Sequence, residues 1–129
     1  MFTTPLDLRA NTAPNEWVLL RSLVWHGDRR IEVPAGFITD LASIPRVFRN
    51  VLNVNGASRR AAVLHDWLYC SQPFTRREAD RMLKAALLAE GEHPIVAQVY
   101  YLGVRIGGSR PWNNRFGQGL KPEDMIDGA

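Results

Sequence analysis

The chain has 129 residues and a formal net charge of +3; 46% of the residues are hydrophobic and 22% are charged. These values predict one globular domain with its own core, and they exclude disorder over the whole chain. The single cysteine, Cys70, excludes an intrachain disulfide and a cysteine-rich zinc site. We expect no signal peptide, because the N-terminus lacks a basic flank followed by an apolar segment. No apolar run approaches the roughly 18 residues of a membrane span.

The first forty residues predict a small antiparallel sheet. Residues 16–25 are rich in Val, Leu and Trp and predict a strand that ends at the turn 26–28. Residues 30–33 predict the second strand of a hairpin, and residues 37–39 resume extended structure. Residues 6–9 could add an edge strand.

After residue 40 the pattern becomes helical. Ser43 can cap a short helix that ends near residue 52, with Pro45 tolerated in its first turn. A second helix is predicted from residue 57 or 58 to about residue 70. Arg59 and Arg60 lie in its first turn, where cations oppose the helix dipole. A nearby anion or carboxylate would suit them better, but exposure to solvent is the simpler explanation.

Two further helices follow. Thr75 and Glu78 have the spacing of a capping box at the start of the third helix, and Gly91 lies where its C-terminal cap is expected. A fourth helix is predicted from Pro94 to about Ile106. Apolar residues surround most of it, as is typical of a helix that is buried on several sides or forms an interface.

The predicted fold class is therefore α+β, with a small antiparallel N-terminal sheet packed against three to four helices. We expect a single domain over residues 1–112. Residues 113–129 predict an extended C-terminal tail, because the chain beyond Gly107 is rich in Gly, Pro and Asn. Such a segment must lie over the domain or contact a partner.

His65 and Asp66 are the most unusual residues of the second helix, because their neighbours along the helix are almost all apolar. The two side chains point about 100 degrees apart on a helix, so both cannot face water without exposing apolar surface. Buried polar groups are usually satisfied by partners. We expect His65 to bond backbone or Asp40, and Asp66 to bond an arginine or a helix N-terminus. The functional alternative is metal binding or proton transfer.

Asp40, Ser43 and Asp80 are the other candidates for chemistry. Asp40 and Ser43 follow the last predicted strand, where they can cap a helix. Ser43 could instead be a nucleophile with His65 as its base, although no Gly-x-Ser-x-Gly elbow is present. Asp80 lies on the third helix beside its apolar stripe and could reach His65 or Asp66; Tyr69 and Arg105 are further candidates for pairing with these carboxylates. A divalent metal site would use Asp40, His65, Asp66 and Asp80.

Two segments together carry a family resemblance: Thr39-Asp40-x-Ala42-Ser43-Ile44-Pro45 and His65-Asp66-Trp67-Leu68-Tyr69. With Ala79-Asp80 and the Gly107-Gly108 end of the fourth helix, they resemble a family of small proteins of unknown function from tailed bacteriophages and prophages. The similarity covers roughly residues 30–112. The resemblance implies a phage origin close to tail genes, and it implies no established reaction and no assigned catalytic residues.

Three functions remain open. The resemblance favours a structural or accessory protein of the phage tail or baseplate, in which the Asp and His residues form a buried network. The second hypothesis is a metal-dependent hydrolase of cell-wall peptide, phosphoester or nucleotide, with catalytic candidates His65, Asp66, Asp40 and Ser43. The third is a phage-encoded protein that binds a host factor.

The favoured hypothesis predicts no cofactor, and the hydrolase hypothesis a divalent metal. The favoured hypothesis also predicts other virion proteins or further copies of the chain as partners, with Tyr100, Tyr101, Trp112 and Phe116 at the interface. We expect synthesis in the host cytoplasm and then incorporation into the virion. Nucleic acid is not expected as a partner, because the arginines are scattered in doublets and not gathered in one run.

Overall fold

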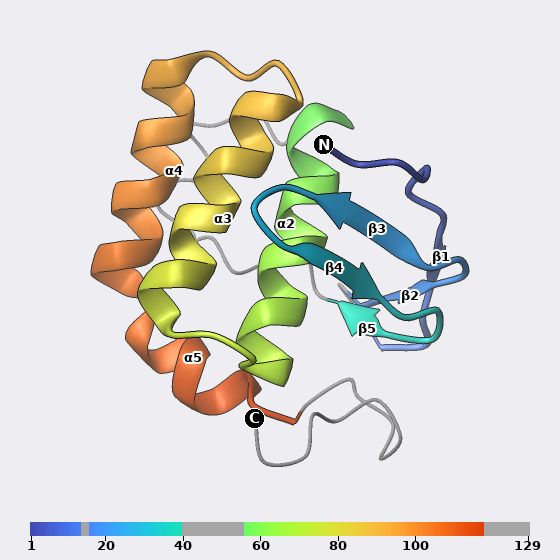
Figure 1. Cartoon of the computed structure of the whole chain (residues 1–129). Helices are drawn as coiled ribbons and strands as arrows, with labels where there is room; N and C mark the ends of the chain where they lie inside the picture. Colours follow the sequence, from blue (N-terminus) through green and yellow to red (C-terminus); the bar gives the residue numbers. More distant parts are fainter. Residues whose placement is uncertain (14–15, 40–55, 118–129) are drawn as a thin grey trace.

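The computed structural model describes residues 1–13, 16–39 and 56–117 (Figure 1). The described strands are β1 (Leu8–Ala10), β2 (Trp17–Leu19), β3 (Leu23–His26), β4 (Arg30–Val33) and β5 (Ile38–Thr39). The described helices are α2 (Gly56–Ser71), α3 (Arg76–Ala89), α4 (Pro94–Gly107) and α5 (Ser109–Arg115). This is the predicted α+β arrangement of a small N-terminal antiparallel sheet region followed by helices. None of the described helices is long and apolar enough to cross a membrane.

The strands form two small antiparallel sheets, of order β1-β2-β5 and β3-β4. The predicted hairpin is present, with Trp25 opposite Ile31 in the β3–β4 register. The prediction of one strand over residues 16–25 is wrong, because β2 and β3 belong to different sheets. The chain bends between them, and Leu19 and Leu23 on either side of the bend are both buried. An unbroken strand would not change sheets at this point.

Three long helices lie side by side, with α2 between the strands and the pair α3 and α4 (Figure 1). The Thr75 hydroxyl accepts from the Glu78 backbone N–H and the Glu78 carboxylate accepts from the Thr75 backbone N–H, so the predicted capping box begins α3. Gly91 follows α3 at φ 90°, a left-handed conformation that glycine adopts without strain. α4 has Pro94 as its first residue, as predicted.

One continuous core joins the strands to the helices, and α2 is its centre. Every residue from Ala61 to Cys70 is buried. The Phe37 ring meets the Trp67 ring edge-on at 5.3 Å between centroids, which fastens the end of the sheet region to α2. The other large buried side chains include Leu19, Leu23, Leu64, Leu68, Leu83 and Leu87.

The C-terminal region departs from the predicted extended tail, because α5 continues across residue 112 to Arg115. Trp112 packs edge-on against Tyr69 at 5.1 Å, and the Gly117 N–H donates to the Cys70 carbonyl at 2.9 Å. The chain therefore contacts α2 both at the predicted domain end, residue 112, and beyond it. The rest of the predicted tail, and the predicted helix from Ser43 to residue 52, lie outside the described residues.

Candidate functional site

The candidate site begins with His65, Asp66 and Tyr69, three polar residues on the most deeply buried helix. All three residues are 0% exposed. Because α2 is covered by strands of both sheets and by α3, these three side chains do not reach bulk water. Burying such groups is costly unless they find partners within the protein.

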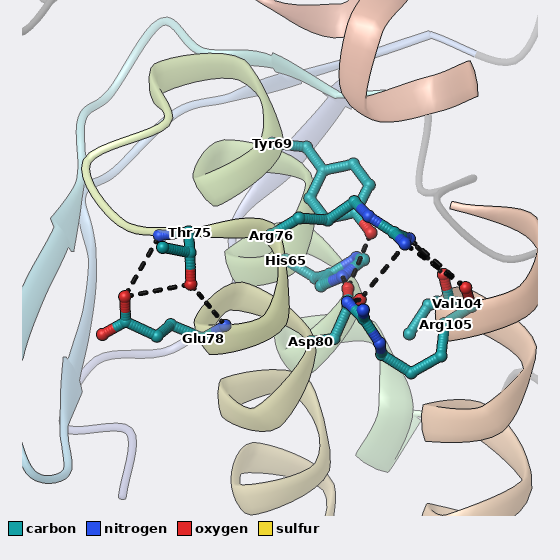
Figure 2. Close-up of polar contacts among 8 residues, drawn as sticks. All are labelled: His65, Tyr69, Thr75, Arg76, Glu78, Asp80, Val104 and Arg105. Atoms are coloured by element: carbon teal, nitrogen blue, oxygen red, sulfur yellow. Dashed lines mark hydrogen bonds and ion pairs between the residues drawn. The ribbon is translucent and has the colours of Figure 1, made fainter. Parts of the chain in front are cut away.

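Asp80 of α3 is the partner of His65 and Tyr69 (Figure 2). Its Oδ1 lies 2.7 Å from His65 Nε2 and accepts a hydrogen bond from the Tyr69 hydroxyl at 2.6 Å. Its Oδ2 accepts from Arg105 Nη1 of α4 at 2.8 Å. One carboxylate therefore joins α2, α3 and α4. We call His65, Tyr69, Asp80 and Arg105 the Asp80 cluster.

Arg76 supports the Asp80 cluster from the start of α3. Its guanidinium lies 3.8 Å from Asp80 Oδ2 and donates to the carbonyls of Val104 at 3.1 Å and Arg105 at 3.4 Å. These carbonyls belong to the last turn of α4, where helix carbonyls lack intrahelical partners. Arg76 thus stabilises the end of α4 and adds positive charge beside Asp80.

The charges in this cluster shift two pKa values. Burial by itself would raise the pKa of Asp80. The hydrogen bond from His65, the attraction of its imidazolium form, and the bonds from Tyr69 and Arg105 outweigh burial and hold that pKa below its usual value. Burial and the hydrogen bond to the Asp80 carboxylate raise the pKa of Tyr69 well above its ordinary value. Asp80 is thus ionised and Tyr69 is a neutral donor over the physiological range.

His65 Nδ1 is the unsatisfied atom of the cluster. It is buried and has no hydrogen-bond partner among the described residues. The Tyr69 ring covers the imidazole at 4.2 Å between centroids. Since an ionised carboxylate only accepts, a neutral imidazole beside Asp80 carries its proton on Nε2. That tautomer leaves a free lone pair on Nδ1.

Asp66 belongs to a second cluster. Arg115 of α5 binds it in bidentate fashion, from Nε to Oδ1 and from Nη2 to Oδ2, both at 2.9 Å. The Thr39 hydroxyl donates to Oδ2 at 2.8 Å and the Cys70 thiol donates to Oδ1 at 3.7 Å. Arg115 also donates to the Ile38 carbonyl at 3.2 Å, so this cluster fastens β5 and α5 to α2.

The structure brings together some of the predicted site residues. Asp80 reaches His65 and pairs with Tyr69 and Arg105, and Asp66 bonds an arginine, as the sequence suggested. Asp66 and Asp80 stand in different clusters with different cations. Asp40 and Ser43 lie outside the described residues. Within the described ranges, no three His, Cys, Asp or Glu side chains are grouped as a metal site, and the four-residue metal site stays a prediction.

Sequence reasoning gave Arg115, Thr39 and Gly108 no role in the site. No local pattern links Arg115 to Asp66, because 49 positions separate them. A Cβ on Gly108 would lie 2.5 Å from the Tyr69 hydroxyl and 2.9 Å from Arg76 Nη1, and it would also collide with the Val104 carbonyl. The glycine therefore allows the backbone to approach the Asp80 cluster closely. Its position at the end of α4 was the only signal in the sequence.

The four predicted interface aromatics have different environments. Tyr100 is in the core, which removes its ring from any surface contact, and Trp112 packs on Tyr69. Tyr101 is half-buried and Phe116 is exposed. An interface role for Tyr101, Trp112 and Phe116 stays a prediction.

A family model described as "Protein of unknown function (DUF1353)" matches residues 17–104. That range contains the strands from β2 onward, α2, α3, residues 94–104 of α4, and three members of the Asp80 cluster; the fourth, Arg105, lies one residue beyond it. No curated protein and no solved structure matches the chain.

Proposed function

Because the chain belongs to the DUF1353 family, whose description gives no function, we propose one from its site: the protein is a hydrolase in which His65 is the general base. The observation that carries the proposal is a buried histidine whose Nε2 is held by Asp80 and whose Nδ1 has no hydrogen-bond partner among the described residues. A purely structural network would satisfy each of its buried polar atoms. In the neutral tautomer with the proton on Nε2, Nδ1 carries a basic lone pair that no described residue takes up.

The Asp80 cluster has the parts that a general base needs. Asp80 fixes the imidazole tautomer and orientation, and its negative charge stabilises the imidazolium that forms on proton transfer. Tyr69 and Arg105 hold both carboxylate oxygens, so the orienting group cannot rotate away. A water molecule is the smallest partner that satisfies Nδ1 in a buried polar site.

The proposed reaction follows from that water. As its oxygen attacks an acyl carbon or a phosphorus, its proton passes to His65 Nδ1. Cleavage of the bond to the leaving group then returns the proton from Nδ1 to that group. Water is thus divided between the two products, and His65 ends neutral. Because the imidazole is fully buried, the substrate reaches it only after a local movement of the fold.

Metal dependence is a separate part of this proposal. Asp66 and Asp80 are each paired with a guanidinium, from Arg115 and Arg105 respectively. A cation that used these carboxylates would have to displace an arginine. We therefore expect equal metal content in wild type and His65→Ala by inductively coupled plasma mass spectrometry. About one metal per chain, lost in His65→Ala, would instead support the site of Asp40, His65, Asp66 and Asp80.

The test of the hydrolase is His65→Gln, whose amide N–H can still donate to Asp80 but which has no basic nitrogen. The assay panel is cell-wall peptide, phosphodiesters and phosphomonoesters, and nucleotides. We expect hydrolysis by the wild type to fall about 10²- to 10⁴-fold in His65→Gln. His26→Gln, the same change at an exposed histidine, should keep full activity. Equal rates in wild type and His65→Gln, with both folded by circular dichroism, would refute the proposal.

A second candidate function is a virion-associated accessory protein of a phage tail or baseplate. Exposed apolar residues on α4 favour protein–protein contacts, and the resemblance to phage and prophage proteins gives the context. If this candidate is right, the protein sediments with purified particles and is found in them by mass spectrometry. Absence from particles that contain the other tail proteins would refute it. A particle-borne hydrolase would satisfy both candidates.

A further inference from the structure

The turn that joins β3 to β4 lies beside α3 (Figure 1), and both line a cleft of about 410 Å³. This volume is within the range of small-molecule sites, which is roughly 300 to 1,000 Å³. The turn contributes residues 27–29 to the cleft. One face of α3 contributes four side chains at the spacing of successive helical turns: Glu78, Arg81, Met82 and Ala85.

Trp25 brings an unused hydrogen-bond donor to this cleft. The residue is 4% exposed, and the Phe2 ring packs against the indole at 4.9 Å between centroids. Nε1 has no hydrogen-bond partner among the residues that the structure describes, although a buried indole N–H usually has one. A Cβ on Gly27, which also lines the cleft, would lie 2.7 Å from this nitrogen. Any other residue at position 27 would crowd the donor, so the glycine keeps it available.

The charged groups that line the cleft balance one another. Two are cations, Arg29 and Arg81, and two are carboxylates, Asp28 and Glu78. Arg29 is held in place, because its guanidinium lies 4.4 Å from the centre of the Phe74 ring and 3.6 Å from Glu78 Oε2. The capping box of α3 in turn holds Glu78. This pair therefore forms a fixed part of the wall.

Arg81 and Asp28 are the charges that remain for a ligand. Both are exposed, and neither makes a hydrogen bond or an ion pair in the described part of the chain. They lie on opposite walls, Arg81 on α3 and Asp28 on the turn. Met82 and Ala85 add apolar surface beside Arg81. A ligand thus meets one cation, one anion, one neutral donor and an apolar patch.

We propose that this cleft binds a short zwitterionic peptide with an apolar side chain. Its carboxylate accepts from the Arg81 guanidinium and the Trp25 indole, and its ammonium donates to Asp28. The apolar side chain packs on Met82 and Ala85.

The charge balance and the separation of the charges select this class of ligand. A phosphate would bring negative charge beside two carboxylates, those of Asp28 and Glu78, which is unfavourable. A free amino acid has both of its charges on one carbon, whereas the charges of a peptide are far enough apart to reach both walls. No residue of the Asp80 cluster lines the cleft, so the inference does not rest on the role of His65.

The indole N–H of Trp25 can report on binding in the full chain labelled with ¹⁵N-tryptophan. Its resonance is identified by its loss in Trp25→Phe. With alanyl-leucine as the probe, we expect a saturable shift of the Trp25 signal and no shift of the Trp67 signal. Leucine and inorganic phosphate should leave both signals unchanged. An unshifted Trp25 signal at millimolar alanyl-leucine, or equal binding of leucine or phosphate, would overturn the proposal.

Variants and blocked peptides test which group binds which charge. Arg81→Ala should weaken binding of alanyl-leucine by about tenfold or more, because a charge-assisted contact is lost. Arg77→Ala is the matched control, since Arg77 is exposed on the same helix and does not line the cleft. It should bind like wild type. Unchanged affinity in a folded Arg81→Ala would overturn the proposal.

The orientation of the peptide follows from combining the two kinds of change. Acetylation of the ammonium should weaken binding to wild type by about tenfold or more, and should have little effect in Asp28→Asn. Amidation of the carboxylate should likewise weaken binding to wild type and have little effect in Arg81→Ala. If each modification instead weakens binding equally in wild type and in its matching variant, the proposed contacts are wrong.

Discussion

His65 and Asp80 lie on different helices, are both 0% exposed, and are joined at 2.7 Å between Nε2 and Oδ1. This contact decides the tautomer of the imidazole. Because Asp80 is ionised and accepts from Tyr69 and Arg105 as well, it cannot donate to His65. The proton of a neutral His65 is therefore on Nε2.

The tautomer can be measured directly. In a long-range proton–nitrogen correlation spectrum at neutral pH, we expect Nε2 of His65 to have the shift of a protonated nitrogen and Nδ1 that of an unprotonated nitrogen. Asp80→Asn should remove this preference, because the neutral amide can accept or donate. The opposite tautomer in the wild type would refute the arrangement on which the hydrolase proposal rests.

Asp80 should make stability depend on acid. The pKa of Asp80 is lowered in the folded chain, so the ionised carboxylate stabilises the fold. This contribution is complete above the ordinary Asp value of about 4 and is lost as the pH falls through the lower folded value. We expect the free energy of unfolding in urea to decline less steeply below pH 5 in Asp80→Asn than in wild type. Asp28→Asn, at an exposed position, should follow the wild-type curve.

The ion pair between Asp66 and Arg115 should be important for stability, because Arg115→Ala leaves a buried carboxylate without its cation. The loss in free energy of unfolding should be about 3–5 kcal/mol. Replacing both residues, with Asp66→Leu and Arg115→Met, should cost less than the sum of the two single changes, because no unpaired charge remains. Additive single and double changes in urea denaturation would show that the pair is not coupled.

Gly108→Ala should destabilise the fold, because its Cβ would collide with the Val104 carbonyl and lie 2.5 Å from the Tyr69 hydroxyl. A cost of about 1–3 kcal/mol is typical of such overpacking. Gly107→Ala is the control at the neighbouring exposed position, where alanine favours helix and should be neutral or stabilising. Equal melting temperatures for the two variants would contradict the close approach at Gly108.

Local features could be predicted from the sequence, and long-range pairings could be predicted only as sets of candidates. The capping box of Thr75 and Glu78 depends on residues three positions apart, so its pattern is visible in the chain. His65 and Asp80 were both recognised as polar residues beside apolar stripes. Which of the possible pairs forms depends on how α2 packs against α3, and the sequence does not specify that register.

The two predictions that failed, for residues beyond 112 and for residues 16–25, have the same origin: each depends on contacts between residues far apart in the chain. The contact of Arg115 with Asp66 crosses 49 positions, so residues beyond 112 gave no local sign that they form a helix attached to the core. Likewise, the apolar run over residues 16–25 does not reveal that Leu19 and Leu23 serve different sheets. Strand pairing partners decide that break, and they lie elsewhere in the chain.

Asp80 has a consequence for how the protein opens. Its two oxygens bind groups from α2 and α4 while the residue itself belongs to α3. Separating any one of these helices from the others would break hydrogen bonds to the Asp80 carboxylate and leave it only partly paired, which is costly. The three helices should therefore unfold together as one cooperative unit, with similar protection of their amides from hydrogen exchange. α5 has no buried residue of its own, but its Arg115 pairs with the buried Asp66 of α2, so detaching α5 would also leave a buried carboxylate without its cation.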